Sequence, residues 1–154
     1  MKSKKWLMKS EPDVYSIDHL IEDGVTHWEG IRNYQARNFM MNDMSIGDEV
    51  FFYHSNTEIP GIVGLAEVSS EAYPDFFAWD QDSKYFDPRS TKENPRWFMV
   101  DVKFKKKFDT IISLSDIKKD QGLKEMLVVK KGMRLSIQPV MVEEFQYIIE
   151  KYTK

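Results

Sequence analysis

The residue types best suited to ligand chemistry lie in one run, Trp28-Glu-Gly-Ile-Arg-Asn-Tyr-Gln-Ala-Arg-Asn38. A tryptophan just before a glycine can form the wall of a pocket, because the glycine lets a ligand approach the backbone closely. Arg32 and Asn33 stand at the expected start of a helix, where free backbone N–H groups and the helix dipole favour an anion. The Arg32 guanidinium is a forked donor for a phosphate or a base edge, and the Asn33 amide offers a donor and an acceptor together. The alternative interpretation is that Trp28 is core, Arg32 is surface and Asn33 only caps the helix.

Two further segments carry side chains that can line a ligand site. The segment 51–55 ends an expected strand, whose alternation places Tyr53 and Ser55 on one face and Phe52 and His54 on the other. Polar groups at such a strand end can line the mouth of a barrel. The long segment 73–97 is rich in aromatic side chains, namely Phe76, Phe77, Trp79, Tyr85, Phe86 and Trp97. Accessible aromatic rings stack on nucleobases, worth about 1–3 kcal/mol per base, whereas buried rings would only pin the segment onto the core.

The sequence offers little support for catalysis. Its three histidines, His19, His27 and His54, form no His-x-x-x-His pair, and the absence of cysteine excludes disulfides, thiolate zinc sites and cysteine nucleophiles. Neither a Gly-x-Ser-x-Gly turn nor a phosphate-cradling glycine loop occurs. Carboxylates gather in the long segment, but their irregular spacing is typical of an exposed acidic loop; they are Asp75, Asp80, Asp82 and Asp87. We therefore expect no catalytic residues, no metal and no cofactor.

The 154 residues carry a net charge of −3 that is distributed unevenly. Residues 1–101 hold 10 Lys and Arg against 18 Asp and Glu, whereas residues 102–154 hold 12 against 7, so the second part is basic. The overall balance argues against a protein that binds nucleic acid through phosphates alone, but it permits one basic side. No apolar run approaches the roughly 20 residues of a membrane span, and no apolar signal core follows the basic N-terminus. We expect a cytoplasmic protein without membrane contact.

The elements that must position these side chains are short and of mixed type. Hydrophobic alternation predicts strands at residues 5–9, 50–55, 61–69, 97–104 and 133–138, with the second and third forming an antiparallel hairpin. Capping residues predict helices from Ser16 to Asp23 before Gly24, over 34–42 after Asn33, and from Ser113 or Ser115 to Lys119. A closing helix is expected to begin at Pro139, with Met141, Phe145, Ile148, Ile149 and Tyr152 on one face. This pattern indicates one α+β domain over residues 1–154, a small, partly open β-barrel with peripheral helices.

Several of these motifs together resemble the EVE domain family. They run in order through nearly the whole chain: Lys9-Ser-Glu-Pro12 with Tyr15-Ser16, Trp28-x-Gly-x-Arg-Asn-Tyr-Gln-Ala-Arg-Asn38, Gly47-Asp48, Phe52-Tyr-His-Ser55, Gly61-Ile-Val-Gly64, Pro74-Asp75, Tyr85-x-Asp-Pro88, Pro95-Arg-Trp97, and Arg134-Leu-Ser136 with Pro139-Val140. The resemblance implies a PUA-like fold, which agrees with the barrel expected from the periodicity. The family is related to YTH domains, which bind N6-methyladenine of RNA in an aromatic cage. It therefore implies a non-catalytic module that binds a modified base, cytosine or adenine, in DNA or RNA.

The resemblance also assigns residues to the expected pocket. Trp28 matches the first cage tryptophan, and Trp79 is expected to be the second wall, with Tyr85 or Phe77 as alternatives. Ser10, Asn33 and Ser55 are expected to recognise the polar edge of the base. Phosphates would be held by Arg32, Arg37 and the basic C-terminal third. The whole expected base-binding set is Lys9, Ser10, Trp28, Gly30, Arg32, Asn33, Tyr53, His54, Ser55, Trp79, Tyr85 and Trp97.

Three functions are therefore open from the sequence. The leading hypothesis is a reader of a modified base, with nucleic acid as its partner and restriction-system proteins as further partners, since bacterial members of the family are often associated with restriction. The second is an enzyme acting on a modified nucleoside or a small amide, using the aspartate cluster or His54. The third is a protein-interaction module in which the acidic loop contacts a partner.

Overall fold

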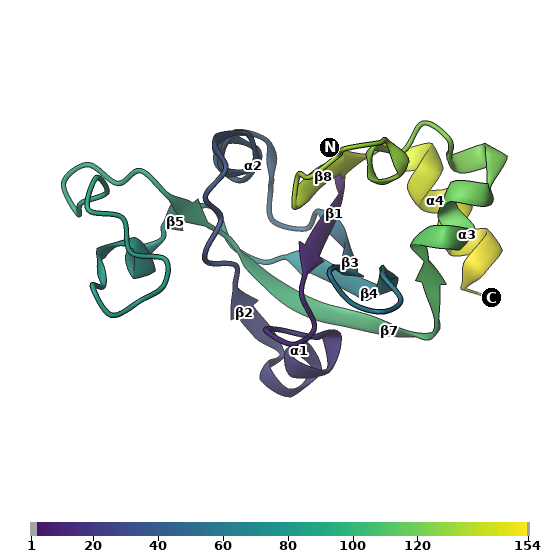
Figure 1. Cartoon of the computed structure of the whole chain (residues 1–154), viewed down its shortest axis with the longest axis horizontal. Helices are drawn as coiled ribbons and strands as arrows, with labels where there is room; N and C mark the ends of the chain where they lie inside the picture. Colours follow the sequence, from purple (N-terminus) through teal and green to yellow (C-terminus); the bar gives the residue numbers. More distant parts are fainter. Residues whose placement is uncertain (1–2, 154) are drawn as a thin grey trace.

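The computed structural model describes residues 3–153 and shows a curled, mixed sheet, a half-barrel, with four α-helices packed around it (Figure 1). The six-stranded sheet has the order β2-β7-β4-β3-β1-β8. Its strands in chain order are β1 (Lys5–Ser10), β2 (Val25–His27), β3 (Glu49–His54), β4 (Gly61–Val68), β7 (Asp101–Ser113) and β8 (Ile137–Val140). β1 pairs in parallel with β3, and the other pairings are antiparallel. The α+β, PUA-like fold expected from the sequence is confirmed.

The first three α-helices begin where the sequence predicts, because their capping residues form the expected hydrogen bonds. The Ser16 hydroxyl accepts from the backbone of His19 ahead of α1 (Ile17–Asp23), and Gly24 follows it with a positive φ of 76°. Asn33 caps α2 (Tyr34–Asn38), and Ser113 caps α3 (Leu114–Lys119). The closing helix α4 (Val142–Tyr152) buries Phe145 and Ile148, as its apolar stripe predicts. None of the helices within residues 3–153 is long and apolar enough to cross a bilayer.

The sheet is buried on both faces, which fixes the direction of every side chain along its central strands. Trp6 and Met8 of β1 belong to a core that includes α1 and Trp28, whereas Leu7 between them packs with the α3–α4 side. The same alternation separates Phe52 of β3 from Phe51, whose ring stacks on Phe145 at 4.2 Å. The helices α3 and α4 lie at one end of the molecule, and the segment between β4 and β7 extends from the opposite end (Figure 1).

Four expected elements have different boundaries in the structure. The strand expected at 97–104 is split into β6 (Phe98–Met99), which pairs with β5 (Tyr73–Pro74), and β7, which continues to Ser113. The helix expected over 34–42 changes after Asn38 into a π-helical turn, Phe39–Asp43. The last strand lies at 137–140 instead of 133–138, and Pro139 belongs to it instead of opening the helix. Proline is tolerated there because β8 is an edge strand and can lack one backbone donor.

The long segment after β5 is ordered by short turns and by buried carboxylates. A 3₁₀ turn over Phe76–Trp79 follows Asp75, whose carboxylate accepts from the Phe77 N–H. Further 3₁₀ turns, Gln121–Leu123 and Leu127–Val129, connect α3 to β8 on the other side of the molecule. Of the aromatic residues in 73–97, Trp97 is buried, whereas Phe76 and Phe86 are exposed and Tyr85 lines a cavity.

Candidate functional site

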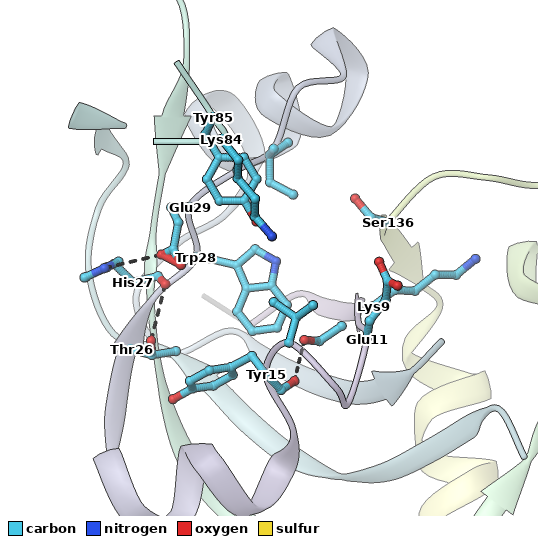
Figure 2. Close-up of a pocket in the computed structure, with 14 residues that line it drawn as sticks. Lys9, Glu11, Tyr15, Thr26, His27, Trp28, Glu29, Lys84, Tyr85 and Ser136 are labelled. Carbon is cyan, nitrogen blue, oxygen red and sulfur yellow. Dashed lines mark hydrogen bonds and ion pairs between the residues drawn. The ribbon is translucent and has the colours of Figure 1, made fainter. Parts of the chain in front are cut away.

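A cavity of about 250 Å³ opens where the end of β1 meets the segment that follows β2 (Figure 2). Its volume is near the lower end of the range for ligand pockets, roughly 300–1,000 Å³, and so suits a small flat group. Trp28 lies at its centre, with Tyr85 on one side and Tyr15 on the other. The lining residues are Lys9, Ser10, Glu11, Val14, Tyr15, Thr26, His27, Trp28, Glu29, Gly30, Ile31, Lys84, Tyr85 and Ser136.

Trp28 forms the floor of this cavity. Its backbone N–H donates to the Val100 carbonyl at 2.8 Å, which ties the segment after β2 to the sheet. Its indole is 8% exposed and meets the ring of Phe52 edge to face, with centroids 5.6 Å apart. Because the core holds most of the indole, the part that remains accessible is rigid and presents a preformed surface to a ligand.

Gly30 allows the aromatic wall to approach this floor. Its φ is +85°, and a Cβ atom placed on it would lie 2.5 Å from Cζ of Tyr85. The Tyr85 ring therefore occupies the space that any other residue at position 30 would fill. Of the three residues expected as the second aromatic wall, Tyr85 lines the cavity, whereas Trp79 and Phe77 do not.

Arg32 positions the Tyr85 wall from outside the cavity. Its Nη2 and Nε donate to the Tyr85 carbonyl at 2.7 and 3.3 Å, and its guanidinium lies over the Tyr85 ring, 5.5 Å from the centroid. Its Nη1 forms an ion pair of 3.0 Å with Asp75, which is fully buried and also accepts from the Gly30 N–H at 2.9 Å. Asp75 thus links Gly30 and Arg32 to the start of the long segment, and these contacts give its buried carboxylate a structural role.

Glu29 is an acidic side chain next to the floor, and it was not among the expected site residues. It lies on the same side of Trp28 as His27, opposite Lys9, Glu11 and Ser136 (Figure 2). Its side chain is 32% exposed, and Oε2 is 3.3 Å from His27 Nε2. Among the described residues this buried oxygen has no hydrogen-bond partner. Burial raises the pKa of Glu29, and the neighbouring His27 opposes this shift.

Two lysines add positive charge at the rim. Lys84 Nζ lies 5.0 Å from the Tyr85 ring centroid. Lys9 is partly buried, which lowers its pKa, and its ammonium lies 5.7 Å from the ring centroid of Tyr53. Ser10, expected to recognise the base edge, lines the cavity, but its hydroxyl donates to the Tyr15 carbonyl. Its oxygen can therefore still accept a hydrogen bond from a ligand.

Four other residues of the expected set serve the fold near the cavity without lining it. Asn33 Oδ1 accepts from the Ala36 N–H at 3.0 Å, so Asn33 caps α2, as the alternative interpretation of this residue predicts. His54 Nε2 accepts from the Ile17 N–H at 3.1 Å, and burial lowers the pKa of His54. The Ser55 N–H donates to the Ser10 carbonyl, which holds the end of β1 beside β3. Tyr53 is buried on the α3–α4 side of the sheet.

The remaining expected residues form a second aromatic cluster that anchors the long segment. Trp97 is 3% exposed and its Nε1 donates to Asp87 at 2.7 Å, while the Tyr34 ring stacks on it at 4.8 Å. Arg37 lies over Tyr34, 4.7 Å from the centroid, and donates to the Arg96 carbonyl. The structure thus turns the donors of Arg32 and Arg37 toward protein groups. No group of three or more His, Asp or Glu side chains within residues 3–153 is arranged to hold a metal ion.

Comparison with known proteins decides the family. A family model described as EVE domain matches residues 4–151. The chain belongs to the EVE domain family. Among curated relatives of this EVE domain, thymocyte nuclear protein 1 of Gallus gallus is 44% identical over 94% of the chain. The chain spans 66% of that longer protein.

Solved structures of similar proteins share the whole architecture of this EVE domain. A hypothetical protein from Leishmania major is 48% identical, with a TM-score of 0.92 over 97% of this chain and 94% of that one. The human THYN1 protein, solved in complex with DNA containing 5-methylcytosine, is 40% identical, with a TM-score of 0.92 over 99% of each chain. An EVE domain of the same shape therefore binds methylated DNA.

Proposed function

We propose that this EVE domain binds DNA that contains 5-methylcytosine and receives the methylated base in the Trp28 cavity. The observation that carries the proposal is the human THYN1 complex with such DNA, together with a TM-score of 0.92 over 99% of both chains. The cavity supplies the chemistry that such binding needs: a rigid indole floor, an aromatic wall and polar groups at the rim.

The base must leave its stack to enter the cavity. Extruding it costs a few kcal/mol from a duplex and less from a single strand. Contacts with Trp28 and Tyr85 offset this cost, because stacking on an aromatic side chain contributes about 1–3 kcal/mol per base. The methyl group adds about 0.8 kcal/mol when it is buried, so transfer alone favours 5-methylcytosine over cytosine only about fourfold.

Glu29 supplies the recognition that the methyl group cannot. Thymine carries the same methyl group as 5-methylcytosine, but it has a carbonyl where cytosine has an amino group. A carboxylate accepts a hydrogen bond from the cytosine amino group and repels the thymine carbonyl. Glu29 lines the cavity beside the Trp28 floor, and among the described residues its Oε2 has no closer polar neighbour than His27 at 3.3 Å, which makes this residue our candidate for the distinction.

The proposal is tested by titrating matched single-stranded and duplex oligonucleotides that contain one 5-methylcytosine, cytosine or thymine. We expect Trp28→Ala to weaken binding of the methylated strand by about 5- to 150-fold, the equivalent of one stacked base. Trp79→Ala removes an indole outside the cavity and should leave the affinity unchanged. Equal affinity of the wild type for all three bases, with no effect of Trp28→Ala in a folded protein, would refute the proposal.

A further inference from the structure

A second hollow, larger than the Trp28 cavity, lies beside it between the end of β1 and α3. Its volume is about 650 Å³, and Tyr53, Leu114, Val128 and Val129 form its apolar part. Five lysines surround them, and no acidic residue lines it; these are Lys9, Lys118, Lys124, Lys130 and Lys131. We call this hollow the lysine groove.

The lysines of this groove differ from most of those on β7 in their partners. On β7, Lys103, Lys105 and Lys107 pair with carboxylates of Glu67, Glu49 and Asp18 at 2.8–3.2 Å. In the groove, Lys130 pairs with Glu125 at 3.3 Å, but no carboxylate within residues 3–153 lies within 4.0 Å of Lys118, Lys124 or Lys131. The positive charge of the groove is therefore largely uncompensated, in a chain whose net charge is −3.

The groove is continuous with the Trp28 cavity. Lys9 lines both, and its backbone N–H donates to the carbonyl of Ser136, which lines the cavity. Gly132 and Met133 line the groove and lead along the chain to Ser136. A strand whose base enters the cavity must continue past its rim on both sides, and one of those sides is the groove.

We propose that the lysine groove holds the phosphodiester backbone of the DNA strand next to the base in the Trp28 cavity. The inference rests on the proposed function for its ligand and adds the path of that ligand. The flexible lysine side chains neutralise phosphates without fixing the sequence, as positioning contacts do. Four of its five lysines lie in the basic C-terminal third, which was expected to hold phosphates together with Arg32 and Arg37, whereas the donors of these two arginines are engaged with protein groups.

The test separates the groove from the cavity by two independent measurements. The first is the slope of log affinity against log salt concentration for a single-stranded oligonucleotide, and the second is the affinity ratio of its methylated and unmethylated forms. The variants are Lys124→Gln with Lys131→Gln in the groove, Lys103→Gln with Lys106→Gln on β7 as a charge-matched control, and Trp28→Ala in the cavity. All four lysines are exposed, so each double variant should fold.

We expect the groove variant to weaken binding of both oligonucleotides equally and to flatten the salt slope by about 1.4, since each lost phosphate contact contributes about 0.7 for a single strand. Its preference for the methylated form should be unchanged, and the β7 control should match the wild type. Trp28→Ala should lose the preference and keep the slope. A groove variant with the wild-type slope and affinity would overturn the groove, even where Trp28→Ala confirms the cavity. A wild type without methyl preference would overturn the proposed function instead.

Discussion

Gly30→Ala adds one methyl group and should close the proposed site. The new Cβ atom would lie 2.5, 2.6 and 2.9 Å from three atoms of the Tyr85 ring, well inside van der Waals contact. Because Arg32 holds the Tyr85 backbone through its carbonyl, the side chain must relieve the overlap by rotating its ring away. We therefore expect the ring to be pushed out of its position as the cavity wall.

Two separate costs follow from this substitution. The first is backbone strain, because a φ of +85° costs a residue with a Cβ atom about 1–2 kcal/mol of folding stability. Gly24→Ala is the matched control, since Gly24 has a φ of +76° and nothing within 4 Å of the added Cβ. The second cost is lost stacking on the displaced Tyr85, about 1–3 kcal/mol, or a 5- to 150-fold weaker affinity for the methylated oligonucleotide.

A double-mutant cycle with Tyr85→Ala isolates the contact. Denaturant unfolding gives the stability of each variant, and calorimetric titration with the methylated oligonucleotide gives its affinity. Gly30→Ala should weaken binding in the wild-type background and should add no further loss when Tyr85 is already alanine. Gly24→Ala should lose stability and keep its affinity. Fully additive losses of affinity for Gly30→Ala and Tyr85→Ala would show that the two positions do not act through their contact, and the reasoning would fail.

Three more substitutions probe other groups. Asp120→Ala should lower the free energy of unfolding by about 2–3 kcal/mol in denaturant melts, because Tyr147, Tyr152 and Lys151 all donate to Asp120. Burial pushes the pKa of Asp120 up, but these hydrogen bonds outweigh it and hold the pKa below its usual value, so this stability is present above about pH 4 and should be lost as the pH falls further. Burial lowers the pKa of His54, so the wild type should lose stability as the pH falls below about 6.5, and His54→Gln should flatten that part of the stability curve. Burial raises the pKa of Glu29, so the stability that its protonated form contributes is lost as the pH rises through that pKa. Glu29→Gln should therefore stabilise the free protein at pH 7 and weaken its preference for 5-methylcytosine over thymine. A less stable variant with the wild-type preference would contradict this role.

Local signals in the sequence were sufficient for most of the fold. The caps Ser16, Asn33 and Ser113 each accept the expected backbone hydrogen bond, and the hairpin of β3 and β4 is antiparallel as predicted. The extension of β7 beyond Phe104 was not predicted, because three consecutive lysines interrupt the apolar alternation there. Those lysines are accommodated by register shifts in the pairing with β4, which no local pattern encodes.

The site was predictable in part, for a physical reason. Trp28 and Gly30 lie two positions apart in a distinctive motif, and both line the cavity. Tyr15, Lys84 and Ser136 come from distant segments, and only the sheet order brings them together. The sequence also predicted three site residues that hold the fold instead: Arg32, Asn33 and Trp97. Their side chains can recognise bases and phosphates, but the same chemical groups also cap helices and anchor loops.

The distribution of charge limits the salt dependence that the proposed DNA binding can show. The lysines of β7 are largely neutralised by neighbouring carboxylates, so the net basicity of the C-terminal third overstates the charge available to phosphates. The four exposed lysines of the groove set a ceiling of about 3 on the salt slope for a single strand. With so few phosphate contacts, most of the discrimination between DNA sites must come from the base in the cavity. A measured slope well above that ceiling would show that phosphates are held by a different surface, and it would remove the reason for assigning selectivity to Trp28, Glu29 and Tyr85.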